Sequence, residues 1–441
     1  MKTSLSALFC LSLALFLSSS LEARLSPQRS ALDNGLVLLT SEQRALPMVT
    51  LSLLIEAGSR FEPKGSEGLA NLTARLLTYG TRTRTALEIS DTLDFLGAQL
   101  TTECSEDVAS LSLTVLKKDL GAALDLLAEI LTASVFPPEE IEREKQSVIA
   151  SIRAKEEEPG EIAHEKFLGA LFPQSPYGRP VEGTEESVAK IAQSSLLEFY
   201  RRLYRPNRAI VAVVGEISHR EMVEKLTKAF GRWVKGEAAK GPPPSVTPGG
   251  KNFIAVHKEL TQANIIVGHE GVARGHPDYY AIQVMNYILG GGGFSSRLIE
   301  AIRNERGLAY SVYSEFDADK HVGSFQVAMQ TRNESADEAI RIAVEEIRRV
   351  QRQGATGEEI QSARDYLIGS FPLRLDTNRK VANFLSQVEY LGLGLDYPDR
   401  YPALIRRVGQ DDVLRAARRY LQPDKLIVVV VADQQKAKVA K

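Results

Sequence analysis

The chain has 441 residues, of which 44% are hydrophobic, 25% charged and 7% aromatic. At about 100–200 residues per domain this predicts a globular protein of two to four domains and excludes a disordered or fibrous chain. The 54 basic and 56 acidic side chains give a formal net charge of −2, so charge offers no argument for binding nucleic acid or an acidic membrane.

The first 23 residues have the pattern of a signal peptide. Lys2 supplies a positive charge, residues 5–17 form an apolar run, and Ala23 lies at an acceptable cleavage position. A membrane-spanning helix needs about 20 apolar residues, so this run is short for a retained anchor. We therefore predict an exported protein, periplasmic in a double-membrane bacterium or otherwise secreted, without stable membrane insertion.

Removal of residues 1–23 leaves Cys104 as the only cysteine of the mature chain. No internal disulfide can then form, even in an oxidising compartment. Because no histidine lies close to Cys104 in the sequence, we expect it to be a small buried side chain and not a reactive thiol.

A segment rich in proline and glycine, residues 236–250, divides the mature chain into two nearly equal parts. Its three consecutive prolines cannot lie inside a helix or a central strand, so we interpret the segment as an extended linker. It separates an N-terminal domain at residues 24–235 from a C-terminal domain at residues 251–441.

Both parts show the same order of elements, in which a strand that alternates at period two precedes two amphipathic helices. The strand, the helix and the opening of the next helix fall at 107–116, 120–131 and 137–141 in the first part and at 321–330, 336–350 and 356–360 in the second. We predict an α+β fold of two homologous domains, each a mainly antiparallel sheet with helices packed on one face.

Three stretches of the chain resemble peptidase family M16, the family of pitrilysin, insulinase and the mitochondrial processing peptidase. They are Asn34-Gly35-Leu36-Val37 with Ala57-Gly58-Ser59-Arg60 and Gly68-Leu69-Ala70, then Tyr204-Arg205-Pro206-Asn207, and finally GGGGFSSRLIEAIRNERGLAY at residues 290–310. The resemblance covers nearly the whole mature chain. It implies two M16-type domains, in a chain whose size matches the members that pair with a second subunit.

In this family a His-x-x-Glu-His zinc motif follows Gly-Leu-Ala on a helix. The two histidines lie on one helix face and bind the metal, while the glutamate activates a water molecule. Here Asn71, Ala74 and Arg75 take these three places, and the downstream glutamate ligand falls near Ala150 or Ser151. None of these side chains can replace the ligand it stands for, so we predict that the chain binds no metal.

The segment that follows this helix is also altered. The family commonly has an Asn-Ala pair, which holds the substrate backbone, near the position of Thr101 and Thr102. This departure fits a first half that no longer cuts peptides.

The second half keeps the arginine and the tyrosine, seven residues apart, with which the family completes its active site from the non-zinc half. Here they are Arg303, in a helix expected to begin near Phe294 and to end at Gly307, and Tyr310, at the start of an expected strand. Both side chains can donate hydrogen bonds to a peptide carbonyl and to the oxyanion formed from it, each worth about 3–4 kcal/mol of barrier. The alternative is that Arg303 caps the helix and Tyr310 is a half-buried strand aromatic.

The resemblance therefore implies a zinc-less subunit of a heterodimeric M16 peptidase. Alone it is expected to be inactive. A homologous partner subunit with an intact motif supplies Zn²⁺ and the general base, and Arg303 and Tyr310 act on peptides bound at that site. The alternative is a catalytically inert structural or peptide-binding M16 homologue, similar to the core subunits of a respiratory complex.

Overall fold

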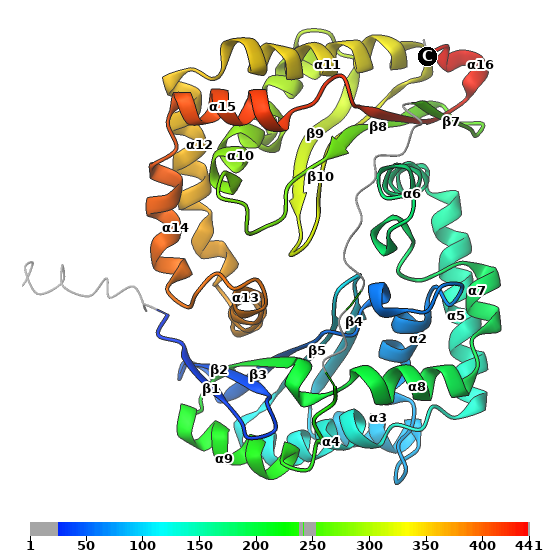
Figure 1. Cartoon of the computed structure of the whole chain (residues 1–441), viewed down its shortest axis with the longest axis vertical. Coiled ribbons are helices and arrows are strands. Elements are labelled where there is room, and N and C mark those ends of the chain that lie inside the picture. The colour runs from blue at the N-terminus through cyan, green and yellow to red at the C-terminus, as the bar shows by residue number, and fades with distance from the viewer. Residues whose placement is uncertain (1–24, 238–240, 242–252, 440–441) are drawn as a thin grey trace, which may run out of the picture.

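The chain forms two α+β halves, each built on one sheet and arranged along the long axis of the molecule (Figure 1). The computed structural model describes residues 25–237, 241 and 253–439. The predicted signal peptide and most of the predicted linker lie outside these residues. None of the helices within the described ranges is both long enough and apolar enough to cross a membrane.

The first sheet has six strands in the order β1-β2-β6-β3-β5-β4. They are β1 (Gln28–Ala31), β2 (Val37–Glu42), β3 (Met48–Ile55), β4 (Gln99–Cys104), β5 (Ala109–Leu116) and β6 (Ala209–Gly215). Only β2 and β6 run parallel. In β5 the side chains alternate between buried and partly exposed, as its period-two sequence predicts, so one face of the sheet covers the core of this half.

The second sheet has five strands in the order β7-β11-β8-β10-β9. They are β7 (Phe253–His257), β8 (Gln262–Glu270), β9 (Ala309–Ala318), β10 (Gly323–Arg332) and β11 (Ile427–Ala432). This order repeats the series β2-β6-β3-β5-β4, and the one parallel pair, β7 with β11, is again at the same place. The predicted repeat and the α+β class are therefore confirmed.

Helices cover both sheets. In the first half they are α2 (Leu69–Arg75), α3 (Ala86–Phe95), α4 (Leu120–Ala133), α5 (Pro138–Glu157), α6 (Pro159–Leu171), α7 (Glu185–Lys190), α8 (Gln193–Leu203) and α9 (His219–Phe230). In the second half they are α10 (Tyr279–Asn286), α11 (Ala336–Gln353), α12 (Gly357–Gly369), α13 (Asn378–Tyr390), α14 (Tyr397–Arg406), α15 (Gln410–Tyr420) and α16 (Gln434–Ala437).

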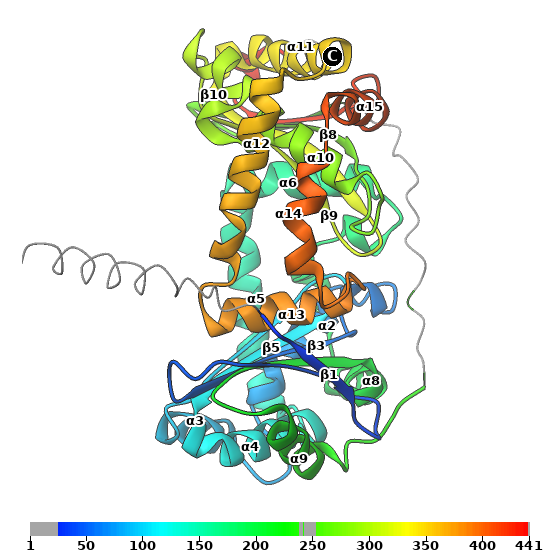
Figure 2. The ribbon, with the colours of Figure 1, turned by 90° about the vertical axis from the view of Figure 1, so that its left-hand side faces the viewer.

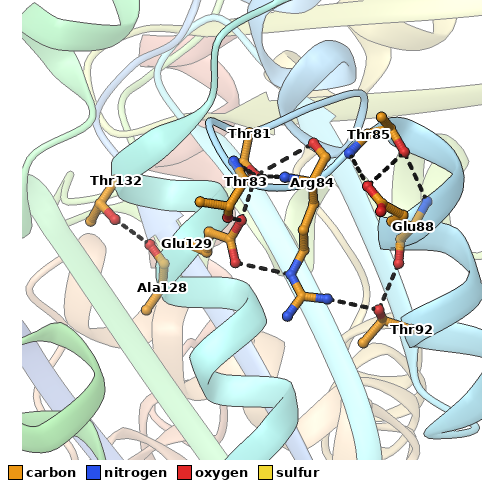
Figure 3. Close-up of polar contacts among 9 residues, drawn as sticks. All are labelled: Thr81, Thr83, Arg84, Thr85, Glu88, Thr92, Ala128, Glu129 and Thr132. Carbon is orange, nitrogen blue, oxygen red and sulfur yellow. Dashed lines mark hydrogen bonds and ion pairs between the residues drawn. The ribbon is translucent and has the colours of Figure 1, made fainter.

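A polar network fixes the start of α3 against α4 (Figure 3). Thr85 and Glu88 form a capping box, in which each side chain accepts a hydrogen bond from the other residue's backbone N–H. On α4, the Glu129 carboxylate accepts hydrogen bonds from Thr83 and from Arg84 Nε, the latter at 3.0 Å. These bonds hold the turn between α2 and α3 in one conformation.

The two halves exchange one helix each, which their sequences did not indicate. The first-half helix α6 packs on β8 and β11 of the second sheet, where Phe167 and Val429 belong to one buried cluster. In return, α13 packs on β3 and β6 of the first sheet, where Leu385 shares a cluster with Leu39. Figure 2 shows α13 across the first sheet, reached from the second half by α12 and α14. Each sheet is thus covered on its second face by a helix of the other half.

Candidate functional site

The helix at the degenerate zinc motif is intact. Gly68 precedes α2 with a φ of 92°, and a Cβ at this glycine would lie 2.5 Å from the carbonyl oxygen of Glu182. The Glu62 carboxylate accepts a hydrogen bond from the Ala70 N–H at 2.8 Å. Leu69 and Leu72 are buried in the first-half core. The helix therefore still places residues 71, 74 and 75 at the spacing that a metal site would use.

An ion pair occupies the side of α2 that faces α5. Arg75 Nε lies 2.5 Å from Glu144 Oε1, and the Glu144 side chain is only 5% exposed while that of Arg75 is 43% exposed. A buried carboxylate is costly unless a cation or donors neutralise it, and the guanidinium does so here. Sequence reasoning missed Glu144 as a member of this group, and a carboxylate retained close to the lost ligands was the available signal.

The remaining positions of the motif offer no ligand. Ala74 is buried and carries no donor, and the buried Asn71 Nδ2 has no hydrogen-bond partner within the described ranges. Ala150 and Ser151 lie further along α5 with exposed side chains. In the described part of the chain no group of three or more His, Cys, Asp and Glu residues is arranged to hold a metal ion. These residues do not fit a zinc ion, because the guanidinium of Arg75 stands among them.

Two ionisable groups near this helix have strongly shifted pKa values. Burial raises the pKa of Glu62 to about 8, although the hydrogen bond from Ala70 acts in the opposite direction. Burial also raises the pKa of the Cys104 thiol, which packs against the first-half core and donates to the Ser105 carbonyl. A thiol with a raised pKa is a poor nucleophile.

Thr101 and Thr102 lie on β4, the edge strand of the first sheet. Within that sheet β4 is paired only with β5. Edge strands offer backbone N–H and C=O groups to a further strand, which is how many proteins bind an extended peptide. Thr101 is exposed on this strand, and α2 packs beside β4.

In the second half, the structure brings Arg303 and Tyr310 together. Arg303 lies at the end of a π-helical segment, Ile299–Asn304, and Gly307, with a φ of 60°, reverses the chain into β9. The Arg303 Cζ atom lies 4.9 Å from the centroid of the Tyr310 ring, and Tyr310 is 81% exposed. The alternative that Tyr310 is a half-buried strand aromatic is therefore wrong.

The expected start of the Arg303 helix is also wrong. Phe294 lies in a separate turn, Gly293–Ser295, and the chain becomes helical again only after Ser296. The interruption lies at Ser296, whose extended backbone (φ −85°, ψ 152°) ends the turn, while Gly293, with a φ of 58°, separates that turn from the preceding helical segment. A π-helical turn is rare and often marks a functional site, and such turns flank this loop on both sides, at Tyr287–Gly291 and Ile299–Asn304.

Sequence reasoning missed a third residue of this group. The Phe294 ring centroid lies 4.9 Å from the Arg303 Cζ atom, and Phe294 is 76% exposed. An aromatic residue directly after a run of four glycines was the available signal. The guanidinium of Arg303 thus contacts two exposed aromatic rings. The guanidinium and the phenol of Tyr310 can both donate hydrogen bonds to a carbonyl oxygen.

Comparison with known proteins gives matches over both halves. Residues 37–185 match the family model of insulinase (peptidase family M16), and residues 190–367 match that of the peptidase M16 inactive domain. An uncharacterized zinc protease of Streptomyces coelicolor is 30% identical over 419 residues, which cover 92% of this chain and 90% of that protein. A second uncharacterized zinc protease, from Bacillus subtilis, is 29% identical over a stretch that covers 80% of this chain and 86% of that protein.

Solved structures show the same fold. A peptidase M16 inactive domain from Pseudomonas fluorescens superposes with a TM-score of 0.88 at 26% identity, over 95% of this chain and all 100% of that one. A protease from Helicobacter pylori superposes with a TM-score of 0.85 at 20% identity, over 92% of this chain and 99% of that one. At that identity the second likeness concerns the fold alone.

Proposed function

Because the chain belongs to peptidase family M16, we propose that it is the zinc-less subunit of a heterodimeric M16 peptidase. It is inert by itself. A homologous subunit with an intact His-x-x-Glu-His motif supplies Zn²⁺ and the general base, and this chain supplies Arg303 and Tyr310 to the shared site. Its substrates are peptides, and it acts after export, in the periplasm or outside the cell.

One contrast between the two halves carries this proposal. On α2, Asn71 and Arg75 stand at the positions of the zinc ligands, and the guanidinium of Arg75 forms an ion pair with Glu144. In the second half, Arg303 and Tyr310 lie side by side at the surface. A purely structural role would explain the first observation but not why an exposed tyrosine and an arginine remain together.

The two side chains of this pair can assist hydrolysis without transferring a proton. The Arg303 guanidinium and the Tyr310 hydroxyl donate hydrogen bonds to the carbonyl oxygen of the peptide bond, and these bonds strengthen as that oxygen becomes an oxyanion. Zinc in the partner supplies the activated water. The guanidinium stays protonated throughout, since an arginine side chain does not lose its proton in proteins.

Relatives support the peptidase class. Both cited curated relatives are named zinc proteases, whereas the cited Pseudomonas structure is named an inactive domain. A non-catalytic member of a peptidase family is compatible with both descriptions. The alternative function, an inert structural or peptide-binding homologue, is favoured by the position of β4 at the edge of its sheet together with the lost zinc ligands.

Co-purification from the native organism tests the proposal. We expect the chain to be recovered with a second M16 protein, zinc to be found in that partner, and peptide hydrolysis only when both are present. In this complex Arg303→Ala or Tyr310→Phe lowers turnover about ten-fold or more. Unchanged turnover in both variants would leave the inert homologue as the correct description.

A further inference from the structure

Phe294, Arg303 and Tyr310 form a cluster that we call the aromatic–arginine clamp. The guanidinium carbon of Arg303 lies 4.9 Å from the ring centroid of each aromatic residue. Both distances are within the range of cation–π attraction, about 6 Å. The three residues come from three different segments. Phe294 follows the four glycines at 290–293, which we call the glycine loop, Arg303 lies in the π-helical turn Ile299–Asn304, and Tyr310 lies on β9.

The glycine loop that precedes Phe294 is held against β9 at its start. A Cβ at Gly290 would lie 2.4 Å from the backbone nitrogen of Ser314, so the close approach requires glycine. Asn286 Nδ2 donates to the Ser314 carbonyl at 3.1 Å, and Ser314 Oγ donates to Asn286 Oδ1 at 2.7 Å. The start of the glycine loop is therefore fixed on the strand that carries Tyr310, and the turn with Phe294, Gly293–Ser295, packs on the helical segment that carries Arg303.

The Arg303 guanidinium contacts aromatic rings, whereas the two neighbouring arginines form ion pairs. Arg297 pairs with Glu359 at 2.7 Å, and Arg306 pairs with Glu305 at 2.7 Å. Within the described ranges, the Arg303 guanidinium contacts the two aromatic rings and forms no ion pair. A guanidinium held by ring faces keeps its N–H donors available for a ligand, whereas an ion pair would occupy them.

We propose that Phe294 is a positioning residue, whose ring holds the Arg303 guanidinium in the orientation that binds the peptide carbonyl oxygen. The inference rests on the proposed function. Phe294 touches no reacting atom in this role. Loss of the ring lets the Arg303 side chain move among rotamers. In fewer complexes is the guanidinium then within hydrogen-bond distance of the carbonyl oxygen when the oxyanion forms. The effect is mainly on kcat, because the hydrogen bond from Arg303 is stronger in the transition state than in the bound substrate, so its loss changes KM little.

Four substitutions in the co-purified complex test this role with a fluorogenic peptide. Phe294→Ala and Phe294→Leu are expected to lower kcat about five-fold with KM within a factor of two, since both remove the π face. Phe294→Trp is expected to restore at least half of the wild-type kcat, because indole is the strongest cation–π partner. Phe95→Ala is the matched control, as Phe95 is an exposed aromatic on α3 of the other half, and no change is expected.

A second measurement needs no partner. In the isolated chain labelled with ¹³C at the arginine guanidinium carbon, the Arg303 signal is identified by its loss in Arg303→Lys. Ring currents displace this signal, and Phe294→Ala should move it toward the values of exposed arginines while Phe95→Ala should not. An unmoved signal would show that the ring does not hold the guanidinium and would overturn the inference.

The outcomes separate the two proposals. If Arg303→Ala impairs turnover but Phe294→Ala and Phe294→Leu do not, the positioning role is wrong and the proposed function stands. If Phe294→Leu behaves as wild type while Phe294→Ala does not, bulk and not the ring is needed, and the role is also wrong. If Arg303→Ala has no effect, the proposed function fails and the positioning role fails with it.

Discussion

Arg75 and Glu144 form an ion pair at the place where the zinc-dependent members of the family would bind their metal. The pair joins α2 to α5, and the Arg75 guanidinium thus neutralises the buried Glu144 carboxylate. Loss of a metal site leaves the remaining acidic side chains without compensation, which is costly in a buried place. The arginine removes that cost, and we expect its positive charge to oppose the binding of a metal ion.

Substitution of Arg75 by alanine should destabilise the first half. It leaves the Glu144 carboxylate buried without its partner, at a cost of about 1–2 kcal/mol, lowered from the value for fully buried pairs because Arg75 is 43% exposed. Urea unfolding measures the difference. The double variant Arg75→Ala/Glu144→Gln should recover most of the loss, since no buried charge remains.

Arg153 provides the control for this pair. It lies on the same helix α5 and pairs with Glu185, but both side chains are more exposed than Glu144. Arg153→Ala should therefore change the free energy of unfolding by less than about 0.5 kcal/mol. An equal loss in Arg75→Ala and Arg153→Ala would contradict the assignment of a special role to Arg75.

Restoring the family's ligands should create a zinc site on this scaffold. The variant Asn71→His/Arg75→His/Ser151→Glu places two imidazoles at i and i+4 on α2 and a carboxylate two helical turns after Glu144 on the same face of α5. We expect one zinc ion per chain in this variant and less than one-tenth of that in the wild type, measured by mass spectrometry of the desalted protein.

The third ligand has two candidate positions, and the same experiment can choose between them. A variant with Ala150→Glu in place of Ser151→Glu carries the carboxylate about 100° further around the helix. Weaker zinc binding by that variant is expected from this geometry. Tighter binding would identify residue 150 as the position that matches the family's glutamate.

His269 predicts how stability depends on pH. Its Nδ1–H donates to the Glu270 carbonyl, its Nε2 accepts from the Gln422 N–H at 3.0 Å, and burial lowers its pKa to about 4. The folded chain thus holds a neutral imidazole, while the unfolded chain gains a proton near pH 6.5. The contribution of His269 to stability is therefore full above pH 6.5 and falls by about 2–3 kcal/mol as the pH drops to 4.5.

Denaturant unfolding at several pH values measures this dependence. His269→Gln should be less stable than wild type at pH 7.5, yet it should lose less stability between pH 6.5 and 4.5. His164, which is exposed on α6, supplies the control substitution His164→Gln, for which the wild-type pH profile is expected. A wild-type profile in His269→Gln would show that His269 does not control acid sensitivity.

Local patterns in the sequence predicted those features that depend on neighbouring residues. The alternation of β5 and the order of elements in both halves were read correctly, because burial on one face imposes a period along the chain. The start of the Arg303 helix was not, since the extended backbone at Ser296, which separates Phe294 from that helix, leaves no periodic pattern in the sequence.

Features that join distant segments could not be predicted in this way. The pairing of Arg75 with Glu144 joins residues 69 positions apart, and the contact of Phe294 with Arg303 depends on the break between their helical turns. The helix exchange is the clearest case. Helix α6 has an apolar face, but its sequence pattern does not indicate that this face packs on the sheet of the other half.

The exchange of α6 and α13 predicts that the two halves unfold together. Phe167 on α6 is fully buried against the second sheet, and a Cβ at Gly268 of β8 would lie 2.3 Å from the Phe325 carbonyl oxygen and 2.6 Å from the Phe167 ring. Phe167→Ala should cost about 3–5 kcal/mol by opening a cavity, and Gly268→Ala should cost about 1–3 kcal/mol by overpacking. Because both changes act on the contact that joins the halves, each should lower one common unfolding midpoint.

A coupled double variant gives the sharper test of this contact. Phe167→Leu removes one of the two groups that the new methyl group of Gly268→Ala would strike, while the Phe325 carbonyl oxygen stays in place. The double variant should therefore be more stable than the sum of the two single losses predicts, by about 0.5 kcal/mol. Calorimetry of the wild type should show a single transition. Two separate transitions, with only one of them moved by Phe167→Ala, would mean that the exchanged helices do not couple the folding of the halves.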